Sequence, residues 1–257
     1  MTEFQIDDEY KFVKEKETGF WRYSHNGTMI PITTEKAFKF YSLNINNIDS
    51  LLNSYFYLSN PSSFNDPFDC NLNLLDSPDH REKIKKMSSF NRNNFSNLGV
   101  VSMTEVIDNH VMWAHYTNNY NGFAIEFNGS EVSVIPSEDQ TAGGAFRKVI
   151  YPKNLVRIKK EYPFAIQYML TTKLKHWEYE KEWRFITFLG QKIDRILHYD
   201  QNKIKGIYVG HQIIENNPSA YRLILSIHSK LYPEVPVYEV YPHPTELDLH
   251  FIKVQPK

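Results

Sequence analysis

The sequence predicts an α+β fold in which a mixed or antiparallel central sheet is flanked by helices. Segments with the period of a strand and segments with the period of a helix follow one another without the regular strand–helix–strand order of a parallel sheet. The chain has 257 residues, of which 41% are hydrophobic and 23% charged, so it can bury a sizeable core. Aromatic residues reach 15%, a surplus that suits stacking sites as well as cores.

No internal repeat, heptad run or Pro/Gly-rich linker marks a domain boundary. We expect residues 1–34 to be an N-terminal extension and residues 35–257 to form a single domain. The start, MTEFQIDDEYKFVKEKE, lacks the basic and apolar parts of a secretory signal, and no apolar run reaches the length of a membrane span. The single cysteine, Cys70, excludes an internal disulfide and fits a reducing compartment. We therefore expect a cytoplasmic protein with no membrane partner.

The first half of the predicted domain begins with aromatic strands. Alternation and aromatic content predict strands over 36–41, 55–58 and 98–103, separated by a short helix over 47–53. The loop NPSSFNDPFDC follows the second strand, and a charged helix is expected over 79–89.

The second half continues in mixed order. A helix over 110–118 precedes a strand over 122–127, a mobile polar loop over 131–144 and a strand over 146–151. Apolar residues at helical spacing predict one long helix over 162–181, followed by an alternating strand to residue 189. The last expected elements are a strand over 204–209, a helix over 219–231 and strands over 235–241 and 247–254.

The stretch KHWEYEKEWRF is therefore a helix-to-strand junction. On the strand, Glu182 and Arg184 project from the same face, so they can share a cleft. A surface ladder of Lys173, Trp177, Glu180 and Arg184 accounts for most of the charges but not for Glu182, which opens an aromatic strand and needs a partner if buried. Glu182 is either half of a structural pair with Arg184 or Lys173, or a positioned catalytic carboxylate.

Two further stretches carry candidate site residues. In FNDPFDC, Asn65, Asp66 and Asp69 either build an Asx-turn or place polar groups at a cleft floor. In MWAHYTNNY, Trp113 and Tyr116 lie three residues apart on one helical face.

These residues differ in what they can do. Trp113 favours core packing, whereas Tyr116 can pack and still hydrogen-bond a ligand. His115 could act as an acid or base near neutral pH. The chain has no metal-binding spacing and no glycine-rich phosphate loop, and its net charge of −1 carries no polyelectrolyte signature, although a local basic patch stays open.

FNDPFDC, MWAHYTNNYNGFAIEF and KHWEYEKEWRF together resemble three blocks of the bacterial family named domain of unknown function 2971. The order of elements is also similar in outline to the ADP-ribosyltransferase-like fold, in particular its DNA- and RNA-modifying branches. That likeness implies NAD as cofactor, Glu182 as the carboxylate at the ribose, Tyr57 or Tyr116 as the ring on nicotinamide, and Lys39 as the basic residue. The usual Arg or His of that family is absent at Lys39.

Three functions follow as hypotheses. The first is an NAD-dependent transferase that cleaves the nicotinamide glycosidic bond toward a nucleic-acid or protein acceptor. The second is a non-catalytic module that binds a nucleotide or nucleic acid by stacking. The third is a nuclease or phosphodiesterase that uses Mg²⁺ or Mn²⁺ with Asp66, Asp69, His115 and Glu182. For the first hypothesis, the catalytic candidates are Glu182, Tyr116 and His115, and the cofactor-binding candidates are Lys39, Tyr57, Asn65, Asp66, Trp113 and Arg184.

Overall fold

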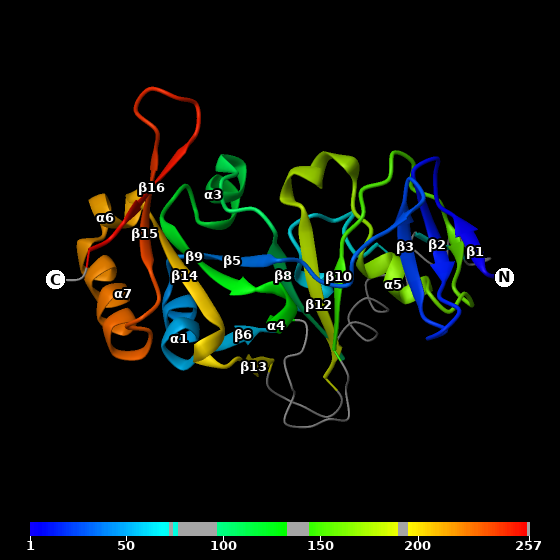
Figure 1. Cartoon of the computed structure of the whole chain (residues 1–257), viewed down its shortest axis with the longest axis horizontal. Helices are drawn as coiled ribbons and strands as arrows, with labels where there is room; N and C mark the ends of the chain where they lie inside the picture. The colour runs from blue at the N-terminus through cyan, green and yellow to red at the C-terminus, as the bar shows by residue number, and fades with distance from the viewer. Residues whose placement is uncertain (72–73, 77–96, 133–143, 190–194, 256–257) are drawn as a thin grey trace. The chain divides into compact units, whose positions relative to one another are not determined.

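The computed structural model describes residues 1–71, 74–76, 97–132, 144–189 and 195–255 (Figure 1). The chain divides into two compact units, each assembled from three separate stretches. Unit 1 comprises Met1–Ile32, Ser59–Val100 and Thr141–Ile193, and unit 2 comprises Thr33–Leu58, Val101–Gln140 and Asp194–Lys257. The stretches of the two units alternate along the sequence, so no single linker with a distinctive composition separates them. The sequence therefore predicted one domain over 35–257.

The N-terminal residues of unit 1 form an antiparallel sheet in the order β1-β2-β3-β4. Its strands are β1 (Glu3–Gln5), β2 (Tyr10–Lys14), β3 (Trp21–His25) and β4 (Thr28–Met29). Tyr10 and Phe12 of β2 are buried, and the Phe12 ring stacks on Phe164 with centroids 4.3 Å apart. The stretch expected to be an extension thus contributes aromatic side chains to the core of unit 1.

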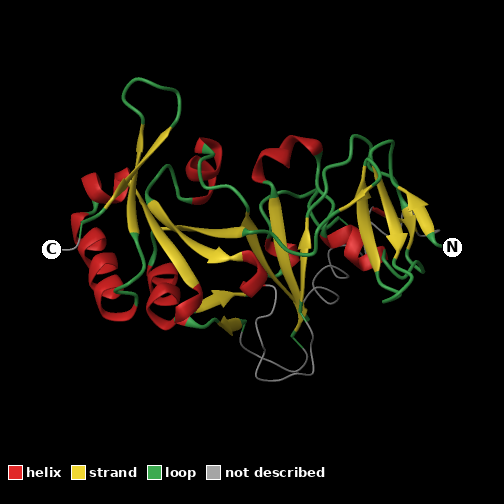
Figure 2. Cartoon of the chain, in the orientation of Figure 1, coloured by secondary structure: helices red, strands yellow, loops and turns green. Residues whose placement is uncertain are grey.

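The remainder of unit 1 combines short helices with paired strands. β10 (Ala145–Lys148) pairs antiparallel with β12 (Glu182–Phe188), and β7 (Leu75–Asp76) pairs parallel with β11 (Ile158–Lys159). The helical segments described in this unit are the 3-10 turns η1 (Pro61–Ser63) and η3 (Lys175–Glu180) and the helix α5 (Ala165–Leu170). Figure 2 shows how much of this unit consists of strands and loops.

The single long helix predicted over 162–181 is wrong, because the chain leaves the helix at Thr171. The Thr171 hydroxyl donates to Gln167 O at 2.6 Å and lies 2.8 Å from the Tyr23 hydroxyl, while Thr172 forms a β-bridge with Ile150. Local side-chain bonds and a tertiary bridge therefore replace helical bonds at this point. The junction with β12 is confirmed: Lys181 ends η3 in a left-handed conformation (φ 42°), and the strand begins at Glu182.

Unit 2 is built on a mixed sheet in the order β8-β5-β9-β14-β15-β16. The bounds of these strands are β5 Lys36–Ser42, β8 Leu98–Thr104, β9 Gly122–Asn128, β14 Ile204–Gly210, β15 Val237–Pro242 and β16 Leu249–Lys253. β8 begins in unit 1 and reaches this sheet with its second half. β14 and β15 are parallel and the other neighbours antiparallel, while β6 (Tyr55–Tyr57) pairs separately with β13 (Ile196–His198). The predicted α+β class with a mixed, mostly antiparallel sheet is confirmed.

Helices α1 (Ile45–Asn53) and α7 (Pro218–Leu231) contact each other beside β14 and β15 (Figure 1). The Asn44 side chain caps α1 by accepting from Asn47 N, and Pro218 opens α7 at a position where no backbone donor is needed. The other helices described in this unit are α3 (His110–Tyr116), α4 (Gly129–Val132), η4 (Gln201–Lys203) and α6 (His211–Asn216).

A tight turn joins α3 to β9. Asn118, Asn119 and Tyr120 all have left-handed backbones, with φ of 52°, 56° and 63°. A Cβ at Gly122 would lie 2.1 Å from Tyr41 O, so only glycine fits there. This turn explains why the sequence N-N-Y-N leads into a strand that begins with glycine.

Two predicted elements lie outside the described residues: the helix over 79–89, and the loop over 131–144 apart from its ends. In the described part of the chain, none of the helices is both long and apolar enough to cross a membrane.

Candidate functional site

The FNDPFDC loop, residues 64–70 of unit 1, is a turn that locks its own backbone. Asp66 Oδ1 accepts from Phe68 N at 2.8 Å, and Asp66 O accepts from Asp69 N at 3.1 Å. Pro67 stands at the second position of this turn, where its fixed φ is suitable. The predicted Asx-turn is confirmed, and it directs the Asp69 side chain inward.

Arg184 ties this loop to strand β12. Its Nη1 and Nη2 donate to the two Asp69 carboxylate oxygens at 2.9 and 2.6 Å, and its Nε and Nη2 donate to the two Glu182 oxygens at 2.7 and 2.9 Å. Nη1 also donates to Leu170 O at 2.7 Å. The Arg184 side chain is 1% exposed, so the planar guanidinium makes all of these hydrogen bonds inside the protein.

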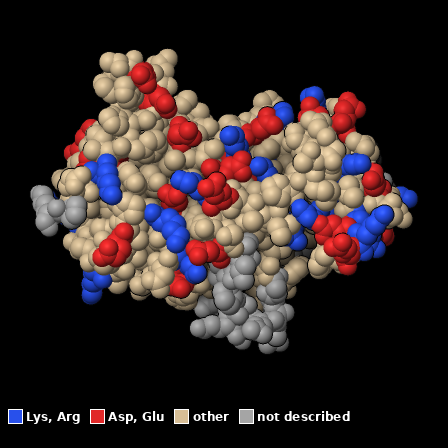
Figure 3. Space-filling view, viewed as in Figure 1, with Lys and Arg blue, Asp and Glu red and all other residues tan. Residues whose placement is uncertain are grey.

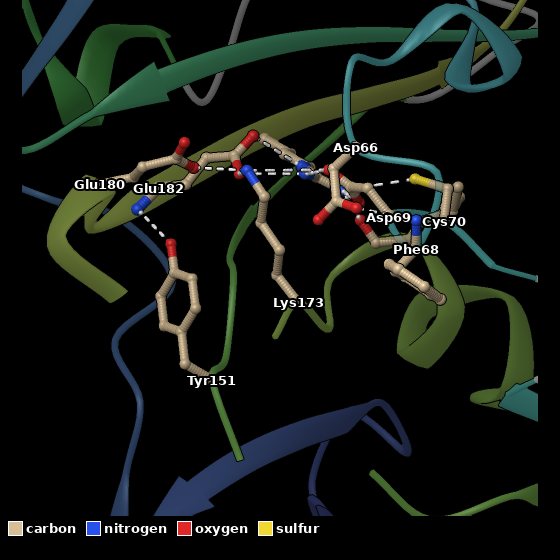
Figure 4. Close-up of polar contacts among 10 residues, drawn as sticks. Asp66, Phe68, Asp69, Cys70, Tyr151, Lys173, Glu180 and Glu182 are labelled. Atoms are coloured by element: carbon tan, nitrogen blue, oxygen red, sulfur yellow. Dashed lines mark hydrogen bonds and ion pairs between the residues drawn. The ribbon is translucent and has the colours of Figure 1, made fainter. Parts of the chain in front are cut away.

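Lys173 is the second cation of the group. Its Nζ lies 2.5 Å from Glu180 Oε2, 3.3 Å from Glu182 Oε2 and 3.8 Å from Asp69 Oδ2. Figure 4 shows the lysine reaching between the two glutamates and Asp69. All of these side chains are buried. We call the five residues Asp69, Lys173, Glu180, Glu182 and Arg184 the ion cluster.

The charges of the ion cluster stabilise one another. Burial lowers the pKa of Lys173, but Glu182 and Glu180 outweigh that effect and raise the pKa above its ordinary value. Burial acts in the same way on Arg184, and Glu182 and Asp69 raise its pKa well above the usual range. Both cations therefore stay charged at any physiological pH.

Two neutral groups complete the surroundings of the ion cluster (Figure 4). The Tyr151 hydroxyl accepts from Glu182 N at 2.9 Å, and burial, followed by the Glu182 charge, raises its pKa well above normal. Cys70 Sγ lies 3.4 Å from Arg184 Nη1, and burial raises the thiol pKa well above normal although Arg184 opposes this. The thiol is thus an inert neighbour at neutral pH.

Aromatic rings lie against the two cations. Lys173 Nζ is 4.6 Å from the centroid of the Trp177 ring, and the Arg184 guanidinium is 5.1 Å from that of Phe64. Both rings are partly exposed, and Phe68 of the same loop is 60% exposed. The rings therefore form the solvent side of a buried charged group.

Carboxylates outnumber cations here. With Asp66, which is 7% exposed, the described part of this group holds four buried carboxylates and two cations. When all are ionised, the excess is two negative charges. Such an excess in a low-dielectric setting favours a positively charged group nearby.

The structure brings four of the predicted site residues into unit 1. Glu182 and Arg184 share a face of β12 as predicted, Asp66 is buried beside Asp69, and Asn65 is exposed in the loop. The surface ladder assigned to Lys173 and Glu180 is wrong, since both side chains are buried. Two interpretations of Glu182 were open: a structural ion pair, or a positioned catalytic carboxylate. The structure shows Glu182 ion-paired with both Arg184 and Lys173.

The other five predicted residues lie in unit 2. Lys39 Nζ is 5.5 Å from the Tyr41 ring, and Tyr57 is exposed on β6. On α3, Trp113 is 0% exposed and donates from its indole to Ile107 O at 2.7 Å, as core packing predicts. His115 is exposed, and its ring lies 6.4 Å from that of the half-buried Tyr116.

Sequence reasoning missed several members of the group. Asp69 was considered as a turn residue, a polar group at a cleft floor or a metal ligand, but not as a partner of Arg184, and Tyr151 and Phe64 were not considered. The spacing of Trp177, Glu180, Glu182 and Arg184 indicated the part of the group that lies on and just before β12. The Asp69–Arg184 pair joins residues far apart in the chain, which spacing alone does not connect.

Two wider observations concern ligands. Among the described residues, no group of three or more His, Cys, Asp or Glu is arranged to hold a metal ion. On the face of the molecule shown in Figure 3, Lys and Arg residues are interspersed with Asp and Glu residues.

A family model described as "Protein of unknown function (DUF2971)" matches residues 112–185. The match begins at Met112 within α3 and extends to Phe185 of β12, so it includes the tight turn after α3 and every member of the ion cluster except Asp69. No curated protein and no solved structure matches the chain.

Proposed function

We propose that unit 1 binds a nucleotide whose ring carries a positive charge, with NAD as the first candidate, and cleaves the bond between that ring and the ribose. The observation that carries the proposal is the buried excess of carboxylates over cations beneath partly exposed aromatic rings. A pyridinium ring is planar and cationic, so it suits both features.

The same charge excess supports a reaction. When the glycosidic bond breaks, nicotinamide departs with the bonding electron pair, and positive charge develops on the ribose. Fixed carboxylates stabilise such an oxocarbenium-like state without reorganising. An acceptor hydroxyl, amine or water then bonds to the ribose carbon and releases a proton. The acceptor can be a nucleic acid or a protein.

The roles within the group differ. Glu182 has both oxygens bonded to cations, so it acts through its charge, and Arg184 holds Glu182 and Asp69 in place. Phe64, Phe68 and Trp177 provide the surface on which a ring stacks. Lys39, Tyr57, Trp113, His115 and Tyr116 belong to unit 2 and carry no step in this proposal.

The test is release of nicotinamide from NAD, followed by chromatography, with water, oligonucleotides and proteins as acceptors. Replacing Glu182 by Gln removes one charge and should lower turnover by about two to three orders of magnitude. Glu178→Gln is the matched control, because Glu178 lies in η3, the segment just before β12, and pairs with Lys175 at the surface. Turnover that is equal in both variants, or absent in the parent with every acceptor, contradicts the proposal.

A non-catalytic binding module is the second candidate, favoured by the fully bonded state of both Glu182 oxygens. In that case the parent binds NAD and releases no nicotinamide. The nuclease hypothesis has less support, because Asp69 and Glu182 are already bonded to Arg184.

A further inference from the structure

One oxygen of a buried carboxylate in the FNDPFDC loop has no hydrogen-bond partner among the residues that the structure describes. Asp66 Oδ1 accepts from Phe68 N, but no donor among the described residues lies within hydrogen-bonding distance of Asp66 Oδ2. Asp66 is 7% exposed, and the oxygen Oδ2 itself is buried. Buried carboxylate oxygens are normally paired, because burial removes the water that would otherwise bind them.

The described surroundings of this oxygen explain why none of their donors pairs with it. Both nearby cations are committed elsewhere: Arg184 bonds Asp69 and Glu182, and Lys173 bonds the two glutamates. The turn also fixes Asp66, since Pro67 follows it and Phe68 N holds its other oxygen. The side chain therefore keeps its position rather than turning toward a partner.

The residues next to Asp66 in the loop face solvent. Asn65 is exposed, and Phe68 presents most of its ring. Figure 4 shows Asp66 beside Asp69, with Phe68 close by in the same loop. Phe68 thus offers a stacking surface on the same turn as a fixed acceptor, and the acceptor oxygen Oδ2 itself has almost no exposed area.

We propose that Asp66 Oδ2 accepts a hydrogen bond from the ligand and selects a cationic ring that bears an N–H donor over the same ring bearing a carboxylate. This inference rests on the proposed function for its ligand class. A carboxamide supplies the donor that the oxygen lacks. A carboxylate on the same ring would place two negative oxygens against each other, with no proton between them.

The experiment uses two small probes and the full chain labelled with ¹⁵N. The first probe is the 1-methylnicotinamide cation, and the second is 1-methylnicotinate, which has the same ring and a carboxylate. Titration is followed at the Phe68 amide, which reports directly on Asp66. We expect the parent to bind the carboxamide about 10- to 100-fold more tightly, as one charge-assisted hydrogen bond requires.

Asp66→Asn sharpens the test, because it keeps an acceptor for Phe68 N and turns the free oxygen into a donor. The preference should shrink to nothing or reverse toward the carboxylate. Asp66→Ser, which can also cap the turn, should abolish the preference without reversing it. Asp200→Asn is the matched control: Asp200 caps Asn202 N in the same way at 2.9 Å but is exposed in unit 2, and its variant should keep the parent's preference.

The outcomes separate this inference from the proposed function. Equal affinity for the two probes in the parent, no binding of either, or an unchanged preference in both Asp66 variants overturns the role of Asp66. Probe selectivity without NAD cleavage supports Asp66 and removes the enzymatic proposal. NAD cleavage without probe selectivity supports the enzymatic proposal and overturns the role of Asp66.

Discussion

Replacing Arg184 by Met tests whether the ion cluster is a coupled unit. The change keeps an unbranched stem as far as the position of Nε and removes five donated bonds to Asp69, Glu182 and Leu170 O. Lys173 remains as the sole cation of the cluster, 3.3 Å from Glu182 and 3.8 Å from Asp69, and it bonds neither carboxylate through two atoms. Two buried carboxylates are then left short of counter-charge.

Removing one partner from a buried ion pair costs about 3 to 5 kcal/mol. For a chain of this size we therefore expect the melting temperature of unit 1 to fall by about 6 to 20 °C. Urea unfolding followed by tryptophan fluorescence measures the free energy, because Trp21, Trp177 and Trp183 lie in unit 1 and only Trp113 lies in unit 2. Arg184→Lys restores a charge but not the fork, so it should recover only part of the loss.

The control is Lys175→Met, which breaks the exposed Lys175–Glu178 pair and should cost less than about 1 kcal/mol. A loss in Arg184→Met as small as this control would refute the view that the buried charges depend on one another.

Three further predictions follow from the same geometry. Because burial and then Glu182 raise the pKa of Tyr151, the free energy of unfolding should be steady below about pH 10 and fall at higher pH; Tyr151→Phe should flatten that fall in urea titrations. Because burial raises its pKa, Cys70 should react slowly with a thiol reagent at pH 8 and quickly in urea, and fast reaction of the folded parent would contradict its placement. Gly122→Ala places a Cβ 2.1 Å from Tyr41 O and should cost at least about 1 to 3 kcal/mol, whereas Gly27→Asn, which meets nothing within 4 Å and retains a left-handed residue, should cost less.

The sequence pattern predicted those elements whose buried residues recur at regular spacing within one short segment. The alternation around β12 and the helical spacing of α7 both involve residues close together in the sequence. Both elements could therefore be predicted from the sequence. The helix over 162–181 was wrong because Thr171 bonds to Tyr23, a tertiary contact that periodicity does not contain. The strands of residues 3–29 were missed because each is short, with at most five residues, so a period of two has little length in which to show.

In the candidate site, too, the local features could be predicted from the sequence and the long-range contacts could not. The shared face of Glu182 and Arg184 was predictable from a spacing of two, and so was the Asx-turn at Asp66. The meeting of Asp69 with Arg184 depends on how the loop folds onto β12, and no single-sequence pattern encodes it. The burial of Lys173 could not be predicted either, because its partners are placed by the break between α5 and η3.

Comparing the affinities of the parent protein for NAD and NADH by titration calorimetry tests the central claim most directly. The two nucleotides differ at the ring, which is cationic in NAD and uncharged in NADH. A single charge about 6 Å from the carboxylate excess is worth about 1.4 to 2.8 kcal/mol at an effective dielectric constant of about 20 to 40. The account therefore predicts that NAD binds about 10- to 100-fold more tightly than NADH. Equal affinities, or tighter binding of NADH, would contradict it.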